Sequence, residues 1–237
     1  MNKENKIKPP SRIWLLVQPL AILELLFFFF SMPFLFFRYP RGNAPILILP
    51  GFLTGDWYMW PMKIILRMKG YRVYGSTFGL SMGYRGRIND GLLKRLREIS
   101  EKNNNQKVAL IGFSLGGIYA RSIAQTCPEL VSQVFTLSSP FMKISNSINI
   151  QNIYRFISGK RFEEDINLEI SGRIKEKLSM PTFSIHSVFD GIVSSESCLE
   201  MEDDNTFNYK VFSTHCGLPH NYYAIKIILE KLSMLEK

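Results

Sequence analysis

The sequence has few of the residues from which metal and cofactor sites are built. Its three cysteines are widely spaced and form no Cys-x-x-Cys pair, which argues against a disulfide framework and against a thiolate-bound metal. It also lacks a glycine-rich phosphate loop, a dinucleotide-binding fingerprint and a cluster of metal ligands. We therefore expect no cofactor and no metal. Histidine is equally scarce, since the chain has only His186, His215 and His220.

Acidic residues are the minority among the charges. There are 20 Asp and Glu against 29 Lys and Arg, a formal net charge of +9. Residues 63–107 alone hold 11 basic and 3 acidic residues. A basic surface suggests anionic lipid headgroups or nucleic acid as a partner. Because the chain has no zinc-finger spacing, RNA-binding signature or basic–aromatic stripe, we expect no nucleic-acid partner.

One motif stands out in what the sequence does contain. Residues 112–116 read Gly-Phe-Ser-Leu-Gly, directly after the apolar run 108–111 and before a helical pattern. A tight strand-to-helix turn lifts a serine hydroxyl clear of the sheet, where a base can activate it. Side chains at Gly112 and Gly116 would clash in such a turn. The pattern predicts that Ser114 is a nucleophile, and an ordinary glycine-rich turn is the alternative.

The start of the helix after Ser114 adds a second feature of hydrolytic chemistry. The first N–H groups of a helix have no partner within the helix. The backbone N–H of Leu115 can therefore face a developing oxyanion. We expect Gly117 to let this helix pack close to the preceding strand.

A serine nucleophile of this kind needs an acid and then a histidine further along the chain. The strand-like residues 181–188 end just before Asp190, and the strand-like residues 208–213 end just before His215. The carboxyl ends of parallel strands lie at one edge of a sheet. We therefore expect Ser114, Asp190 and His215 to meet at that edge.

Other residues compete for these roles. His186 lies inside a strand-like segment, where a hydrogen-bonded core histidine is the simpler interpretation, whereas His220 remains a rival for the base. Asp56 comes too early in the chain to orient a histidine, and Asp190 is also compatible with a plain Asp-Gly turn. An acidic run is interpreted as a solvated face: Glu196, Glu200, Glu202, Asp203 and Asp204.

Four segments share their motifs with a known family. They are residues 46–53, 112–121, 187–193 and 213–218. With these motifs in this order, the chain resembles the bacterial α/β-hydrolases of the lipase and esterase type over roughly residues 44–233. The resemblance is specific for the fold and much less specific for the substrate.

The resemblance also implies roles for particular residues. It implies a catalytic triad of Ser114, Asp190 and His215, which decides against His220 as the base. It further implies that the backbone N–H of Phe52 joins that of Leu115 in the oxyanion hole.

The pattern of strands and helices agrees with such a fold. Strands are predicted at residues 45–49, 71–77, 107–113, 132–138, 182–188 and 208–213, and helices at residues 57–69, 90–102, 115–126 and 219–235. This alternation predicts a parallel sheet with right-handed crossovers. We expect an α/β-hydrolase fold with about six mostly parallel strands flanked by helices, forming a catalytic domain over residues 44–237.

A long insertion interrupts this domain at about residues 141–180. A connection of about 40 residues in a compact domain is usually functional. We interpret it as a short cap over the acyl pocket. A decorated crossover helix that never touches substrate is the alternative.

Residues 1–43 form a basic tail followed by an apolar helical segment. Residues 13–37 contain a single charge, Glu24, and as one continuous helix they would be about 38 Å long, enough to cross a bilayer. However, Pro19 and Pro33 interrupt the segment, and a mid-membrane carboxylate is expensive. The segment also lacks a clear cleavage site for a signal peptide.

Three interpretations of this segment stay open. We favour a bent anchor that lies in one leaflet, over a single membrane span and over a helix that packs on the hydrolase core and closes the pocket, with Glu24 facing the protein. We expect a membrane-associated protein. Basic residues on both sides leave its side of the membrane open, and we favour the cytoplasmic face.

Together these features predict a serine hydrolase that cleaves carboxylic esters of acyl or lipid-like substrates through an acyl-enzyme intermediate. An acyltransferase using the same Ser-His-Asp chemistry is one alternative. A non-catalytic hydrolase fold that docks on membranes as a binding protein is the other.

Overall fold

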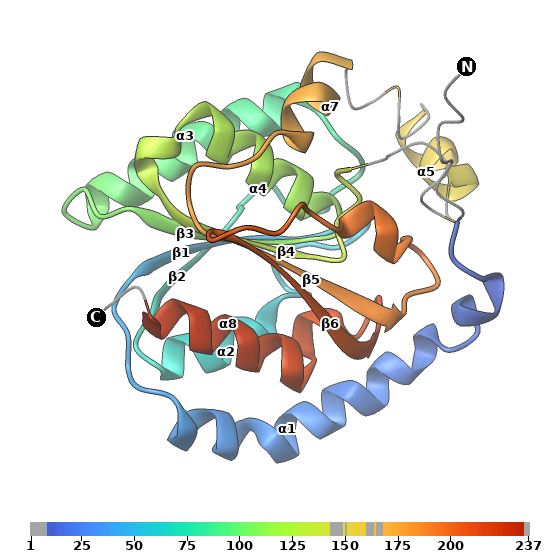
Figure 1. The fold of residues 1–237 in the computed structure, drawn as a ribbon, viewed down its shortest axis with the longest axis horizontal. Coiled ribbons are helices and arrows are strands. Elements are labelled where there is room, and N and C mark those ends of the chain that lie inside the picture. The colour runs from blue at the N-terminus through green and yellow to red at the C-terminus, as the bar shows by residue number, and fades with distance from the viewer. Residues whose placement is uncertain (1–8, 143–148, 150, 160–163, 165–167, 235–237) are drawn as a thin grey trace.

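The fold is built on a six-stranded sheet with strand order β2-β1-β3-β4-β5-β6, in which every neighbouring pair is parallel (Figure 1). The computed structural model describes residues 9–142, 149, 151–159, 164 and 168–234. The strands are β1 Pro45–Leu49, β2 Arg72–Gly75, β3 Val108–Phe113, β4 Val131–Leu137, β5 Thr182–Phe189 and β6 Thr206–Thr214. This is the predicted α/β-hydrolase sheet.

The central strands are apolar because helices cover both of their faces. Every residue of β1 and of β3 is buried, the pattern expected of parallel strands between two helical layers. From β1 the chain passes to β2 on one side, and it then continues from β3 to β6 on the other side. Open parallel sheets bind ligands beyond the carboxyl ends of the strands at such a reversal of strand order.

Helices form a layer on each side of the sheet (Figure 1). One layer contains α3 Gly86–Lys102, α4 Leu115–Thr126 and α7 Leu168–Lys175, and the other contains α1 Ala21–Arg38, α2 Trp60–Met68 and α8 Tyr222–Met234. Shorter elements are η1 Arg12–Leu15, η2 Gln18–Leu20, η3 Pro128–Leu130, α5 Gln151–Ser158, η4 Ser195–Cys198 and η5 Leu218–His220. Each layer buries its own hydrophobic cluster against the sheet.

The six predicted strands and four predicted helices are all present, with shifts at their ends. Helix α3 begins at Gly86 rather than residue 90. The predicted start was too late because the first turn of the helix is polar and gives no apolar periodicity. The prediction that the last helix starts at residue 219 is wrong. Residues 218–220 form η5, and α8 begins at Tyr222, because the side-chain oxygen of Asn221 accepts the N–H groups of Tyr223 and Ala224 and so caps the helix there.

Helix α1 packs across the outside of α2 and α8. Phe28 and Leu35 are fully buried in the core cluster of that layer, so α1 is part of the folded body. Pro33 lies inside α1 without ending it, whereas Pro19 lies in η2 before α1 begins. In the part of the chain that the structure describes, one helical stretch, Gln18–Arg38, is long and apolar enough to cross a membrane, and 17% of it is buried.

Candidate active site

Ser114 occupies a strained turn between β3 and α4. Its φ of 52° and ψ of −119° lie outside the ordinary regions for a residue with a side chain. A Cβ on Gly112 would collide with the backbone of Gly116 and Gly117, and a Cβ on Gly116 would collide with the carbonyl of Leu49. The turn therefore requires glycines where the motif has them, and it has the geometry of a nucleophile elbow.

Asp190 and His215 are in direct contact at the carboxyl ends of β5 and β6. Oδ2 of Asp190 lies 2.7 Å from Nδ1 of His215, and its Oδ1 accepts the backbone N–H groups of Ile192 and Val193 at 2.8 and 2.7 Å. Both side chains are nearly inaccessible to solvent. A carboxylate only accepts hydrogen bonds, so Nδ1 of His215 carries the proton. Nε2 is then left as the basic nitrogen.

The turn at Ser114 lies beside this pair. The ring of Phe113 packs on the imidazole of His215, with 5.0 Å between the ring centroids. The backbone N–H of Ser114 bonds the carbonyl of Leu137 at 2.8 Å. Among the hydrogen bonds of the described residues, none joins the Ser114 hydroxyl to His215. The structure thus joins the predicted acid to the predicted base, and it places the predicted nucleophile next to the residue that contacts that base.

Two backbone N–H groups, those of Phe52 and Leu115, lie beside Ser114. A Cβ on Gly51 would lie 3.1 Å from the Cβ of Ser114, so the loop containing Phe52 runs against the serine. The hydrogen bonds of the described residues use neither the N–H of Phe52 nor that of Leu115. Free donors at this position are what an oxyanion would require.

The competing residues lie in other surroundings. His186 is buried on β5, as predicted, but its Nδ1 has no hydrogen-bond partner among the described residues, so the expectation of a hydrogen-bonded histidine is wrong for that atom. His220 places Nε2 2.9 Å from the carbonyl of Ala21 in α1. Burial lowers the pKa of His186 and the pKa of His220. Asp56 accepts the backbone N–H groups of Ser76 and Thr77 after β2, and it has a structural role there.

The interpretation of the acidic run as a solvated face is wrong for Glu200. Its side chain is 6% exposed and lies 2.5 Å from Nη1 of Arg121, which is fully buried in α4. Arg121 also donates to the carbonyl groups of Ile174 and Glu176. Burial raises the pKa of Glu200 and lowers the pKa of Arg121. The signal in the sequence was Arg121 itself, a charged residue on the buried face of an apolar helix.

Three residues near the site were missed from the sequence as contributors to it. Glu24 and Gln18, in and just before α1, bond the loop that contains His215. The hydroxyl of Tyr58 donates to the carbonyl of Cys216, at 2.6 Å, from the other side of that loop. All three are distant in sequence from His215, so no local pattern indicated that they bond its loop. For Glu24, one of the open interpretations expected only that it faces the protein, as it does.

Within the predicted cap, one described side chain, Tyr154, contacts Phe52. Tyr154 of α5 is buried, with its ring centroid 4.6 Å from that of Phe52. Its hydroxyl accepts the N–H of Tyr84 at 2.9 Å. Helix α7 packs on α4. The remainder of the expected cap, residues 143–148, 150, 160–163 and 165–167, lies outside the described residues.

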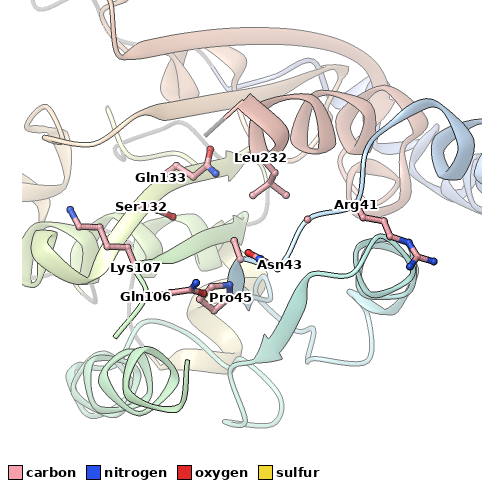
Figure 2. Close-up of a pocket in the computed structure, with 10 residues that line it drawn as sticks. Arg41, Asn43, Pro45, Gln106, Lys107, Ser132, Gln133 and Leu232 are labelled. Carbon is pink, nitrogen blue, oxygen red and sulfur yellow. The ribbon is translucent and has the colours of Figure 1, made fainter. Parts of the chain in front are cut away.

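A pocket lies at the other end of the strands. It has a volume of about 610 Å³ and is lined by residues at the amino ends of β1, β3 and β4, among them Pro45, Lys107 and Ser132 (Figure 2). That is the edge of the sheet opposite Ser114. A much narrower apolar cavity of about 20 Å³ lies at the carboxyl end of β1, lined by residues that include Leu49 and Tyr119.

Comparison with protein families gives one match. Residues 68–196, more than half of the chain, match the model of the family described as palmitoyl protein thioesterase. The match includes Ser114 and Asp190 and ends before His215. No curated protein matches the sequence.

Solved structures match the fold. A monoacylglycerol lipase from Paleococcus ferrophilus has a TM-score of 0.60 at 16% identity and covers 81% of this chain and 96% of its own. A Bacillus licheniformis lipase in its mature form has a TM-score of 0.61 at 15% identity and covers 82% and 94%. A metagenome-derived lipolytic enzyme has a TM-score of 0.63 at 13% identity and covers 81% and 93%. At these identities the likeness shows the α/β-hydrolase fold, and with the family match it supports an ester or thioester hydrolase.

Proposed function

Since the chain belongs to the palmitoyl protein thioesterase family, we propose that it is a serine hydrolase that cleaves long-chain acyl esters or thioesters through an acyl-enzyme intermediate. The observation that carries the proposal is the 2.7 Å contact between Asp190 and His215, beside a serine held in an elbow turn. Burial and two backbone donors to the carboxylate fix this pair in place. A structural role alone does not need an imidazole oriented in this way.

The chemistry follows the roles that these groups can take. Nε2 of His215 removes the proton of Ser114 as the hydroxyl attacks the acyl carbonyl. The N–H groups of Phe52 and Leu115 hold the negative oxygen, and Asp190 stabilises the imidazolium. His215 then protonates the leaving alcohol or thiol. Water, activated by the same histidine, hydrolyses the acyl-enzyme.

The substrate class follows from family membership and from the apolar surroundings. The name of the family refers to a palmitoyl group in a thioester bond, and a thioester uses the same acyl chemistry as the carboxylic ester predicted from the sequence. We therefore include both bonds. A palmitoyl thioester and a palmitoyl ester, compared at matched leaving-group acidity, will show which of the two is preferred.

We further propose that α1 docks in the plane of a membrane, with its outer face in one leaflet. Large apolar side chains project from that face: Leu23, Phe27, Phe30, Phe34 and Phe37 are between 54% and 83% exposed. Arg38, the last residue of α1, and Arg41, just beyond it, suit anionic headgroups. Glu24 faces the protein and bonds residues of β6, contacts that a membrane span would break. The cytoplasmic side remains a prediction.

Vesicle binding tests this placement. Each phenylalanine removed from the lipid-facing surface should weaken the free energy of membrane binding by roughly 1.5–3 kcal/mol. The double variant Phe30→Ser, Phe34→Ser should therefore lower co-sedimentation with anionic vesicles by more than tenfold. Alkaline carbonate should release the wild-type protein from membranes. Retention after carbonate treatment would instead indicate a span.

A fluorophosphonate probe tests the hydrolase itself. The wild-type protein should be labelled once, and Ser114→Ala should not be labelled. Folded wild-type protein that resists labelling and cleaves no acyl ester would favour a non-catalytic binding protein over an enzyme. Equal labelling of Ser114→Ala would place the nucleophile elsewhere.

A further inference from the structure

We propose that Glu24 and Gln18, on the apolar N-terminal segment, are positioning residues that hold the loops of Asp190 and His215 for catalysis. The inference rests on the proposed function. It assigns the segment a role inside the active site, in addition to any role at a membrane.

Glu24 binds the end of β6, immediately before His215. Its Oε1 accepts the backbone N–H and the hydroxyl of Thr214 at 2.8 and 2.7 Å. Its Oε2 accepts the hydroxyl of Ser213 at 2.6 Å and the side-chain amide of Asn221 at 2.9 Å. Four donors thus surround one carboxylate, and hydrogen bonds to a charged acceptor are the stronger kind.

The same carboxylate also contacts the chain after His215. The hydroxyl of Thr214, which donates to Glu24, accepts the N–H of Gly217 at 2.9 Å. A Cβ on Gly217 would collide with the Glu24 carboxylate. Glu24 is therefore packed and bonded against residues on both sides of the histidine.

Gln18 joins the loop of the base to the loop of the acid. Its Oε1 accepts the N–H of Cys216 at 3.2 Å, one residue after His215. Its Nε2 donates to the carbonyl of Phe189 at 3.1 Å, one residue before Asp190. A single uncharged side chain therefore spans the two chain segments whose side chains make the 2.7 Å contact.

Other contacts of the segment reinforce this arrangement. The ring of Trp14 in η1 lies 5.1 Å from the ring of Phe189, centroid to centroid. A Cβ on Gly191, which follows Asp190, would collide with the backbone of Trp14. Both loops are thus packed against residues 14–24 by polar and apolar contacts.

A helix that served only as an anchor would not need these groups. A carboxylate within an apolar helix is costly in lipid, whereas Glu24, in the first turn of α1, accepts hydrogen bonds from Ser213, Thr214 and Asn221. Reaction rates are sensitive to displacements of about 1 Å in a catalytic group, with effects of about 100-fold. Loss of Glu24 would leave the N–H of Thr214 without its acceptor and free the loop of His215 to shift.

Steady-state kinetics of full-length variants on a soluble short-chain ester, without lipid, tests the proposal. Glu24→Ala should lower kcat by roughly 10- to 100-fold and leave KM within about twofold, because the Glu24 carboxylate bonds protein groups. Glu24→Gln keeps an acceptor for Thr214 and should recover part of the rate. Gln18→Leu should lower kcat by a smaller factor. Ser31→Ala is the matched control, since it removes a buried hydroxyl of α1 whose one hydrogen bond among the described residues is to Phe28 of its own helix.

A second readout separates positioning from general damage. The low-field proton resonance of the hydrogen bond between Asp190 and His215 should weaken or broaden in Glu24→Ala and persist in Ser31→Ala. If Glu24→Ala does not fold, the same two measurements on Gln18→Leu and Glu24→Gln test the proposal. Folded Glu24 and Gln18 variants with wild-type kcat would overturn the proposal, as would equal losses in Ser31→Ala. A wild-type protein with no activity that depends on Ser114 would instead refute the proposed function.

Discussion

Ser114 and His215 lie at the same edge of the sheet, but different kinds of contact hold them. The turn at Ser114 is shaped by its own neighbours, Gly112 and Gly116, and by the strand beside it. The loop of His215 is held by Glu24, which is nearly 200 residues away along the chain. The proposed nucleophile is therefore held by local contacts, whereas the proposed base depends on long-range packing.

The largest effect should come from the reacting groups themselves. Ser114→Ala and His215→Ala should each lower kcat on an acyl ester by about 10⁴-fold or more, because triad members act as a unit. His220→Ala should keep most of the activity, since the ring of His220 contacts α1 rather than Asp190. Steady-state kinetics on a soluble ester checks this. A greater loss in His220→Ala than in His215→Ala would contradict the assignment.

Disturbing the turn that holds Ser114 should lower kcat by a smaller factor. Gly116→Ala forces a methyl group against the carbonyl of Leu49 and should lower kcat by roughly 100-fold through displacement of Ser114. Gly86→Ala is the matched control, because a Cβ there meets nothing within 4 Å. Kinetics and thermal unfolding of the two variants give the comparison. Normal activity in Gly116→Ala would show that the turn tolerates a side chain.

Weakening the packing of α1 on the core should lower the stability of the protein. Leu35 of α1 is fully buried in the core cluster, so Leu35→Ala should lower the free energy of unfolding by about 2–5 kcal/mol. Phe30→Ala, on the exposed face of the same helix, should have little effect. Urea unfolding in the absence of lipid measures both. Equal stabilities would mean that α1 is a detachable anchor, not part of the folded body.

The smallest effect concerns pH. Burial lowers the pKa of His186 and of His220, so the unfolded chain binds protons there more readily than the folded protein does. The free energy of unfolding should therefore decline as the pH falls below about 6.5. The decline should be shallower in the double variant His186→Gln, His220→Gln. Unfolding midpoints at pH 5–8 measure the slopes, and identical slopes would count against this cause.

The difference between local and distant contacts explains what could be predicted from the sequence. The elbow, the strand ends and the order of Ser114, Asp190 and His215 follow from short motifs and from the edge rule for parallel sheets. The environment of Glu24 could not be predicted, because its partners on β6 are set by how α1 packs. Glu200 was misread for the same reason, since its partner Arg121 lies on a different element.

The N-terminal segment contains both features that the sequence predicted and features that it did not. The apolar run correctly indicated a helix with an exposed hydrophobic surface. Pro33 suggested an interruption that α1 accommodates, because packing against α2 and α8 supports the helix on both sides of the proline. Composition left an anchor and a helix packed on the core both open, whereas only tertiary contacts identify the residues that Glu24 bonds.

Mass spectrometry of the protein after a rapid acid quench with a palmitoyl thioester shows directly whether Ser114 forms a covalent acyl-enzyme. We expect one palmitoyl group on the peptide that contains Ser114, formed by the wild-type protein and absent from Ser114→Ala. No acyl adduct on a folded protein that turns over the thioester, or an adduct on another residue, would contradict it.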